Sequence, residues 1–108
     1  MSNFDRHHRV ESLLRELTAT FIVNEANPNP LITVTRVSIS PDYRNATVYI
    51  TTIPEDREQD ALIFMKRSGS LLRDFVKKRS DLKIVPSFAF SIDGEERLRQ
   101  HFGGTEEE

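Results

Sequence analysis

Residues 62–83 read LIFMKRSGSLLRDFVKKRSDLK, and this stretch decides the fold. Its pattern predicts two helices separated by a break at Ser68-Gly69, because glycine is a poor helix former that permits a bend. Each helix has apolar residues on one side, as expected for packing on a core. These residues are Ala61, Leu62 and Met65 in the first helix, and Leu71, Leu72, Phe75 and Val76 in the second.

The second half of this stretch is strongly basic. Seven basic residues stand against two acidic ones, although the whole chain has a net charge of −2. The basic residues are Lys66, Arg67, Arg73, Lys77, Lys78, Arg79 and Lys83, and the acidic ones are Asp74 and Asp81. Such a run is usually a solvated helix face, but pairing with two acids cannot neutralise it. We therefore expect a basic side, with Ser70, Arg73 and Lys77, that is free to meet a partner.

Upstream of the quoted stretch, we expect one helix and two strands. The helix begins near residues 3–5 and ends by Asn24, before the prolines of residues 27–30. Its apolar stripe is Val10, Leu13, Leu14, Leu17 and Phe21. Leu31–Ser40 is rich in β-branched residues, and residues 46–51 alternate between apolar and polar. The short turn at residues 41–45 makes these two strands an antiparallel hairpin.

The helix pair has predicted boundaries on both sides. Asp56 and Gln59 have capping-box spacing at its start. A third strand follows at residues 84–92, with Phe88 and Phe90 directed into the core, and Pro86 predicts an edge position or a bulge.

A short C-terminal helix is expected after the third strand. Asp93 and Glu96 form a second capping pair that opens it, and it runs to about Phe102. Gly103-Gly104 ends it.

The 108 residues predict one domain at residues 1–104 and a disordered acidic tail at 105–108. The chain has no cysteine, which excludes disulfides and thiolate zinc sites. It has no apolar run close to the ~20 residues of a membrane span. His7 and His8 are adjacent and would point about 100° apart on a helix, which suits metal binding poorly. We expect no catalytic residue, metal, cofactor or small-molecule substrate, and a monomer in the cytoplasm.

The order helix, strand, strand, helix, helix, strand, short helix predicts an α+β fold with the paired helices on one face of the sheet. This order resembles the type II KH fold, an RNA-binding module. The KH clamp loop GxxG is absent, and Ser68-Gly69 stands in its place.

Over residues 6–102 the sequence is similar to the ribosome-binding factor A family. The blocks that carry the resemblance are Arg9-Val10 with Leu17, residues 37–42 and 46–50, Gly69 with Leu72-Arg73, and Pro86, Phe88, Phe90 and Asp93. Arg67 departs from the family pattern, which commonly has Ala-x-Gly at the break. The resemblance implies a factor without catalytic activity that binds the free 30S subunit and 16S rRNA. It also implies a role in late maturation, including 5′-end processing, and in cold adaptation.

The candidate RNA-binding residues are Lys66, Arg67, Ser68, Gly69, Arg73, Lys77, Lys78, Arg79, Lys83 and Arg36. These residues would bind RNA through contacts with its phosphate groups, so the affinity would fall steeply as the salt concentration rises. Three alternatives stay open at this point. Gly69 is either a plain helix break or a site where the RNA backbone approaches, and Arg36 is either a contact or an edge charge. The basic side could also bind an acidic protein, which would make the chain a protein-interaction module.

Overall fold

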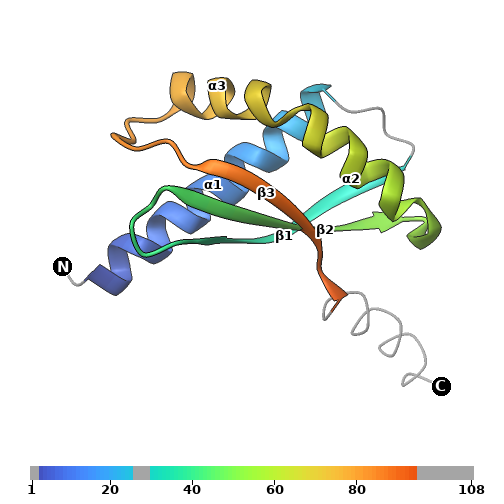
Figure 1. Cartoon of the computed structure of the whole chain (residues 1–108), viewed down its shortest axis with the longest axis horizontal. Helices are drawn as coiled ribbons and strands as arrows, with labels where there is room; N and C mark the ends of the chain where they lie inside the picture. Colours follow the sequence, from blue (N-terminus) through green and yellow to red (C-terminus); the bar gives the residue numbers. More distant parts are fainter. Residues whose placement is uncertain (1–2, 26–29, 95–108) are drawn as a thin grey trace.

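The computed structural model describes residues 3–25 and 30–94, and it has an α+β architecture (Figure 1). Within these residues, three helices pack against a three-stranded sheet, and a 3₁₀ turn precedes α2. In chain order the elements are α1 (Asn3–Glu25), β1 (Leu31–Ile39), β2 (Asn45–Ile53), the 3₁₀ turn η1 (Glu55–Arg57), α2 (Glu58–Arg67), α3 (Gly69–Arg79) and β3 (Ser87–Ile92).

The sheet order is β1-β2-β3. β1 and β2 form the predicted antiparallel hairpin, and β3 pairs with β2 in parallel, as the two-helix connection requires. The hairpin turn is held by the side chains of Ser40 and Asp42. Ser40 Oγ donates to Asp42 Oδ1 over 2.6 Å, and the Asn45 N–H donates to Ser40 Oγ over 3.0 Å. Tyr43 in this turn has a φ of 63°, which is uncommon for a residue other than glycine.

A β-bulge at Thr35 shifts the register of β1 against β2. Val34 pairs with Ile50, whereas Arg36 pairs with Tyr49, so Thr35 is the additional residue. Thr35 and Arg36 therefore both lie on the sheet face that the helices leave open. Val34 and Val37, on either side of them, are buried on the other face.

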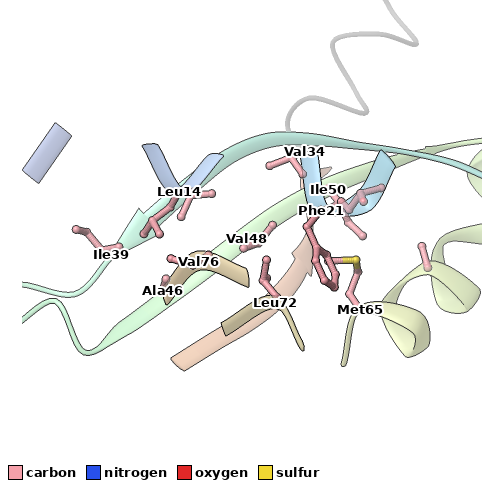
Figure 2. Close-up of a cluster of buried hydrophobic side chains, with 13 residues drawn as sticks. Leu14, Phe21, Val34, Ile39, Ala46, Val48, Ile50, Met65, Leu72 and Val76 are labelled. Atoms are coloured by element: carbon pink, nitrogen blue, oxygen red, sulfur yellow. The ribbon is translucent and has the colours of Figure 1, made fainter. Parts of the chain in front are cut away.

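The core lies between the helices and one face of the sheet. Figure 2 shows side chains from all three helices converging on the buried strand residues. The helices contribute Leu14, Phe21, Met65, Leu72 and Val76, and the strands contribute Val34, Val37, Ile39, Ala46, Val48 and Ile50. Phe88 and Phe90 pack against this cluster, as predicted. The paired helices thus cover one face of the sheet.

The predicted break is confirmed at Ser68, which has φ −90° and ψ 2°. The Ser68 N–H still donates to the carbonyl of Phe64 over 3.0 Å, and the Leu72 N–H donates to the carbonyl of Ser68 over 2.8 Å. Hydrogen bonding therefore continues through the junction, so α2 and α3 form a kinked pair rather than two independent helices.

Two boundary predictions are wrong. The Asp56–Gln59 capping box does not form, because residues 55–57 make a 3₁₀ turn and α2 begins at Glu58 without a side-chain cap. The third strand begins at Ser87 rather than at residue 84, because residues 80–86 cross from α3 to the sheet as a loop. Pro86 is buried one residue ahead of β3, which is an edge strand. The predicted C-terminal helix beyond Gly94 and the acidic tail lie outside the described residues.

A candidate nucleic-acid interface on helix α3

Three of the predicted basic residues gather where α3 faces the loop that follows it. Arg73, Lys77 and Lys83 line a hollow of about 210 Å³ together with Asp74 and Val85. We call this hollow the cationic hollow. All three basic side chains are exposed. Arg73 and Lys77 are four residues apart, so they project from the same side of the helix.

The loop that carries Lys83 is fixed to α3 at both ends. The Arg73 guanidinium donates from Nε and Nη2 to the carbonyl oxygen of Val85, over 3.4 and 3.2 Å. Ser80 Oγ donates to the carbonyl of Val76 over 2.8 Å and accepts the Leu82 N–H over 3.4 Å. The Leu82 side chain packs against the core. Lys83 is thereby held beside Lys77 although no regular element contains it.

Lys78 and Arg79 project from other sides of α3. Each residue turns an α-helix by about 100°, so Lys78 points well away from Lys77. Arg79 lies over the ring of Phe75, with Cζ 4.4 Å from the ring centroid. Phe75 in turn packs edge-on against Phe21 of α1. The basic run of the sequence is therefore divided between at least two sides of the helix.

The kink presents exposed basic side chains at the end of α2 and open backbone at Gly69. Lys66 and Arg67 are exposed in the last turn of α2, where cations also complement the helix dipole. Ser68 is buried. A Cβ built at Gly69 meets no described atom within 4 Å beyond its chain neighbours and the adjacent helix backbone, and its φ is not positive. Neither packing nor backbone conformation in the described part of the fold therefore requires glycine at this position.

Arg36 is not part of this surface. It lies on the open face of the sheet, where its Cζ is 3.8 Å from the centroid of the Tyr49 ring. Its Nε is 3.4 Å from Asp93 Oδ2, and the same oxygen accepts a hydrogen bond of 2.6 Å from Thr35 Oγ1. Asp93 is buried, and its contacts with Thr35 and Arg36 join β1 to the end of β3.

A second hollow lies next to the first, and sequence reasoning did not find it. Arg6, Val10, Tyr43, Leu82, Lys83 and Ile84 line it, and its volume is also about 210 Å³. We call it the apolar hollow. It forms because the start of α1, the β1–β2 turn and the α3–β3 loop meet at one end of the molecule (left in Figure 1). Of its lining, the sequence had marked Lys83 as a candidate RNA-binding residue and Val10 as part of the apolar stripe of the first helix.

The chemistry of the basic groups on α3 and its loop suits phosphate binding. Across residues 3–25 and 30–94, no three His, Asp or Glu side chains are grouped so that they could hold a metal ion. In the same ranges no helix is both long and apolar enough to cross a membrane.

Ammonium and guanidinium groups that line one hollow can neutralise a phosphate, and the open backbone at Gly69 lets a chain approach α3 closely.

The family model described as ribosome-binding factor A matches residues 6–102 of the chain. The chain belongs to the ribosome-binding factor A family. The ribosome-binding factor A of Chlamydia pneumoniae is 35% identical over 98 residues, which cover 86% of this chain and 82% of the relative.

Solved structures of the family agree with this membership. The crystal structure of ribosome-binding factor A from Thermus thermophilus superposes with a TM-score of 0.73 at 25% identity, covering 80% of this chain and 93% of that one. A homology model of the Thermus thermophilus factor, fitted into a cryo-EM map of a 30S–RbfA complex, superposes with a TM-score of 0.68 at 25% identity. It covers 77% of this chain and 90% of that one. The fold is thus the KH-like α+β fold that the element order predicted.

Proposed function

We propose that this protein binds the free 30S subunit through 16S rRNA and assists the late maturation of that RNA, including processing of its 5′ end. The cationic hollow is the observation that carries the proposal, because three cations are held together on a surface with little opposing charge. Family membership and the 30S complex of the Thermus thermophilus relative support the choice of partner. The protein would act without catalysis, as a monomer in the cytoplasm.

The binding surface runs along α3 from the kink to the loop after the helix. At the kink, Lys66 and Arg67 supply charge and Gly69 supplies open backbone, while Ser68 is buried beside it. At the other end, Arg73, Lys77 and Lys83 contact phosphates. Lys78 and Arg79 add to the positive field without lining the cationic hollow. Arg36 is left out of the surface because the sheet separates it from α3.

Phosphate contact makes a quantitative prediction about salt. Single-stranded nucleic acid releases counterions so that the logarithm of affinity falls with the logarithm of salt with a slope of about −0.7 per contact. Three contacts in the cationic hollow therefore give a slope of about −2. This slope separates RNA binding from an apolar protein interface, which would show much weaker salt dependence.

Cosedimentation with purified 30S subunits over a salt series tests the proposal. We expect binding at low salt that weakens along this slope, and binding to protein-free 16S rRNA with similar salt dependence. If the protein stayed off the subunits at low salt, the assembly-factor proposal would fail. If it bound subunits but not their free RNA, and bound isolated acidic ribosomal proteins, the protein-interaction alternative would replace it.

The maturation role needs a test in cells. A bacterial strain that lacks its own family member can be complemented with this chain, and unprocessed 5′ ends of 16S rRNA can be measured by primer extension. We expect the wild-type chain to lower the unprocessed fraction and the Lys77→Glu/Lys83→Glu variant to leave it high. An equal effect of both chains would contradict a role for the cationic hollow in maturation.

A further inference from the structure

Lys83 lines both hollows, so the two are neighbours on one surface. Their linings differ in kind. The cationic hollow has Arg73, Lys77 and Lys83, with Asp74 as an opposing carboxylate. The apolar hollow has aliphatic and aromatic side chains, with Arg6 and Lys83 as its charged members. An occupant that fits both must therefore have an anionic part joined to a flat or apolar part.

The walls of the apolar hollow are held in place. Val10 and Leu82 pack against the core, and the Tyr43 ring lies edge-on to His7, with centroids 5.3 Å apart and planes at 64°. His7 Nε2 is itself 3.0 Å from the carbonyl oxygen of Ile39. Ile84 is 44% exposed, and the two charged members, Arg6 and Lys83, are exposed as well. A packed wall with an exposed isoleucine beside it can cover an apolar group.

The backbone at Tyr43 supports the same interpretation. A left-handed φ is unfavourable for a residue with a bulky side chain, and glycine or asparagine would adopt it more easily. The hydrogen bonds of Ser40 and Asp42 hold the turn in this conformation. The turn therefore places an aromatic ring at the hollow in spite of an unfavourable local backbone conformation.

We propose that one unstacked RNA nucleotide spans the two hollows, with its base in the apolar hollow and its phosphate in the cationic one. Lys83 would lie between base and phosphate. This inference rests on the proposed function. It identifies a single nucleotide as the part of the RNA that binds next to the C-terminal half of α3. Unpaired bases stack on aromatic side chains when proteins recognise single-stranded RNA.

Size and charge favour a nucleotide over other occupants. A hollow of about 210 Å³ is smaller than the ~300 Å³ lower bound of clefts for drug-sized ligands. An inorganic anion would gain nothing from Tyr43 and Ile84, and an apolar peptide would leave three cations unpaired in the adjoining hollow. A nucleotide uses both groups of residues.

The test compares short single-stranded RNA with a polyphosphate of equal charge. Binding of fluorescein-labelled pentauridylate and pentaadenylate is measured for the wild type, for Ile84→Ser, and for Leu71→Ser as a control. Leu71 is also exposed, at 56%, but it does not line either hollow. We expect Ile84→Ser to lower RNA affinity about tenfold, comparable to the loss of one base contact, with polyphosphate binding unchanged. Leu71→Ser should bind both ligands like the wild type.

Crosslinking gives a readout that does not depend on affinity. Pentamers that contain 4-thiouridine should crosslink to peptides that contain Tyr43 or Leu82–Ile84. The inference is overturned if crosslinks form only elsewhere and Ile84→Ser binds RNA like the wild type. In that event the wild-type protein would still bind 30S subunits if the proposed function holds, so the two failures are distinguishable.

Discussion

The guanidinium of Arg73 binds the carbonyl oxygen of Val85, with Nη2 at 3.2 Å. This contact connects the middle of α3 to the loop that returns the chain to the sheet. One lysine of the cationic hollow lies on each side of the connection, Lys77 on the helix and Lys83 on the loop. Arg73 is therefore a positioning residue for the hollow as well as one of its charges.

Arg73→Lys tests this positioning role because it keeps the charge. Lysine presents a single ammonium group and cannot reproduce the planar two-nitrogen donor of arginine. We expect the free energy of unfolding to fall by no more than about 1 kcal/mol, since the contact is exposed. Subunit affinity should nevertheless fall severalfold in equilibrium binding, because Lys83 is no longer held beside Lys77. Wild-type affinity in Arg73→Lys would show that charge alone is sufficient.

Gly69→Ala separates the two interpretations of the kink. Beyond its chain neighbours and the adjacent helix backbone, no described atom lies within 4 Å of an added Cβ, and alanine restricts the unfolded chain more than glycine does. We expect the free energy of unfolding to rise by about 0.4–1 kcal/mol in chemical denaturation. Subunit binding should weaken, because the methyl group would occupy the space through which the RNA backbone approaches. Ser70→Ala, one residue along the exposed helix surface, is the control, and equal binding by both variants would make Gly69 a plain helix break.

The cluster on the open sheet face should contribute to stability and not to binding. Asp93 is buried and accepts from Thr35 Oγ1, so Asp93→Ala should lower the free energy of unfolding by about 1–3 kcal/mol. Arg36→Ala removes only the exposed partner and should cost less than about 1 kcal/mol. Both folded variants should keep wild-type subunit affinity. A loss of affinity in Arg36→Ala would return Arg36 to the RNA-binding surface.

The hairpin turn predicts a pH dependence. Hydrogen bonds from the Ser40 hydroxyl and the Arg44 N–H hold the pKa of the Asp42 carboxyl below its ordinary value of 3.8. A lowered pKa in the folded state means that the ionised form stabilises the fold above pH 3.8, and that this stabilisation is lost as pH falls through the folded-state value. Asp42→Asn should therefore be less stable than the wild type at neutral pH. The difference in unfolding free energy should shrink at strongly acidic pH, and a constant difference would contradict this origin.

Sequence periodicity predicted most of the elements and most of the core, because apolar stripes such as Leu14 to Phe21 and the alternation around Val48 depend only on helical and strand repeats. Leu71 is a wrong prediction, because it was placed on the core side of α3 and is 56% exposed. Local irregularities were not predictable in this way. The bulge at Thr35 and the 3₁₀ turn before α2 depend on tertiary packing that overrides local preference. The loop before β3 contains Ile84 and Val85, whose apolar character gave it the appearance of a strand.

The sequence predicted which helix carries the candidate site but not how its side chains are arranged. The run of basic residues identified α3, and Gly69 identified the kink. The sequence did not show that Lys77 and Lys83 line one hollow while Lys78 turns away, because this depends on the side on which the loop crosses the helix. The apolar hollow combines residues from three distant segments, and no spacing in the sequence brings Arg6, Tyr43 and Ile84 together.

The most direct measurement compares Lys77→Glu with Lys78→Glu in 30S cosedimentation over a salt series. The two variants have the same charge and adjacent positions, and circular dichroism can verify that both remain folded. Lys77→Glu should lower affinity at least about tenfold and make the salt slope shallower by about 0.7, as expected for one lost phosphate contact. Lys78→Glu should lower affinity less and leave the slope close to that of the wild type. Equal losses of affinity and slope in the two variants would contradict the cationic hollow as the RNA contact.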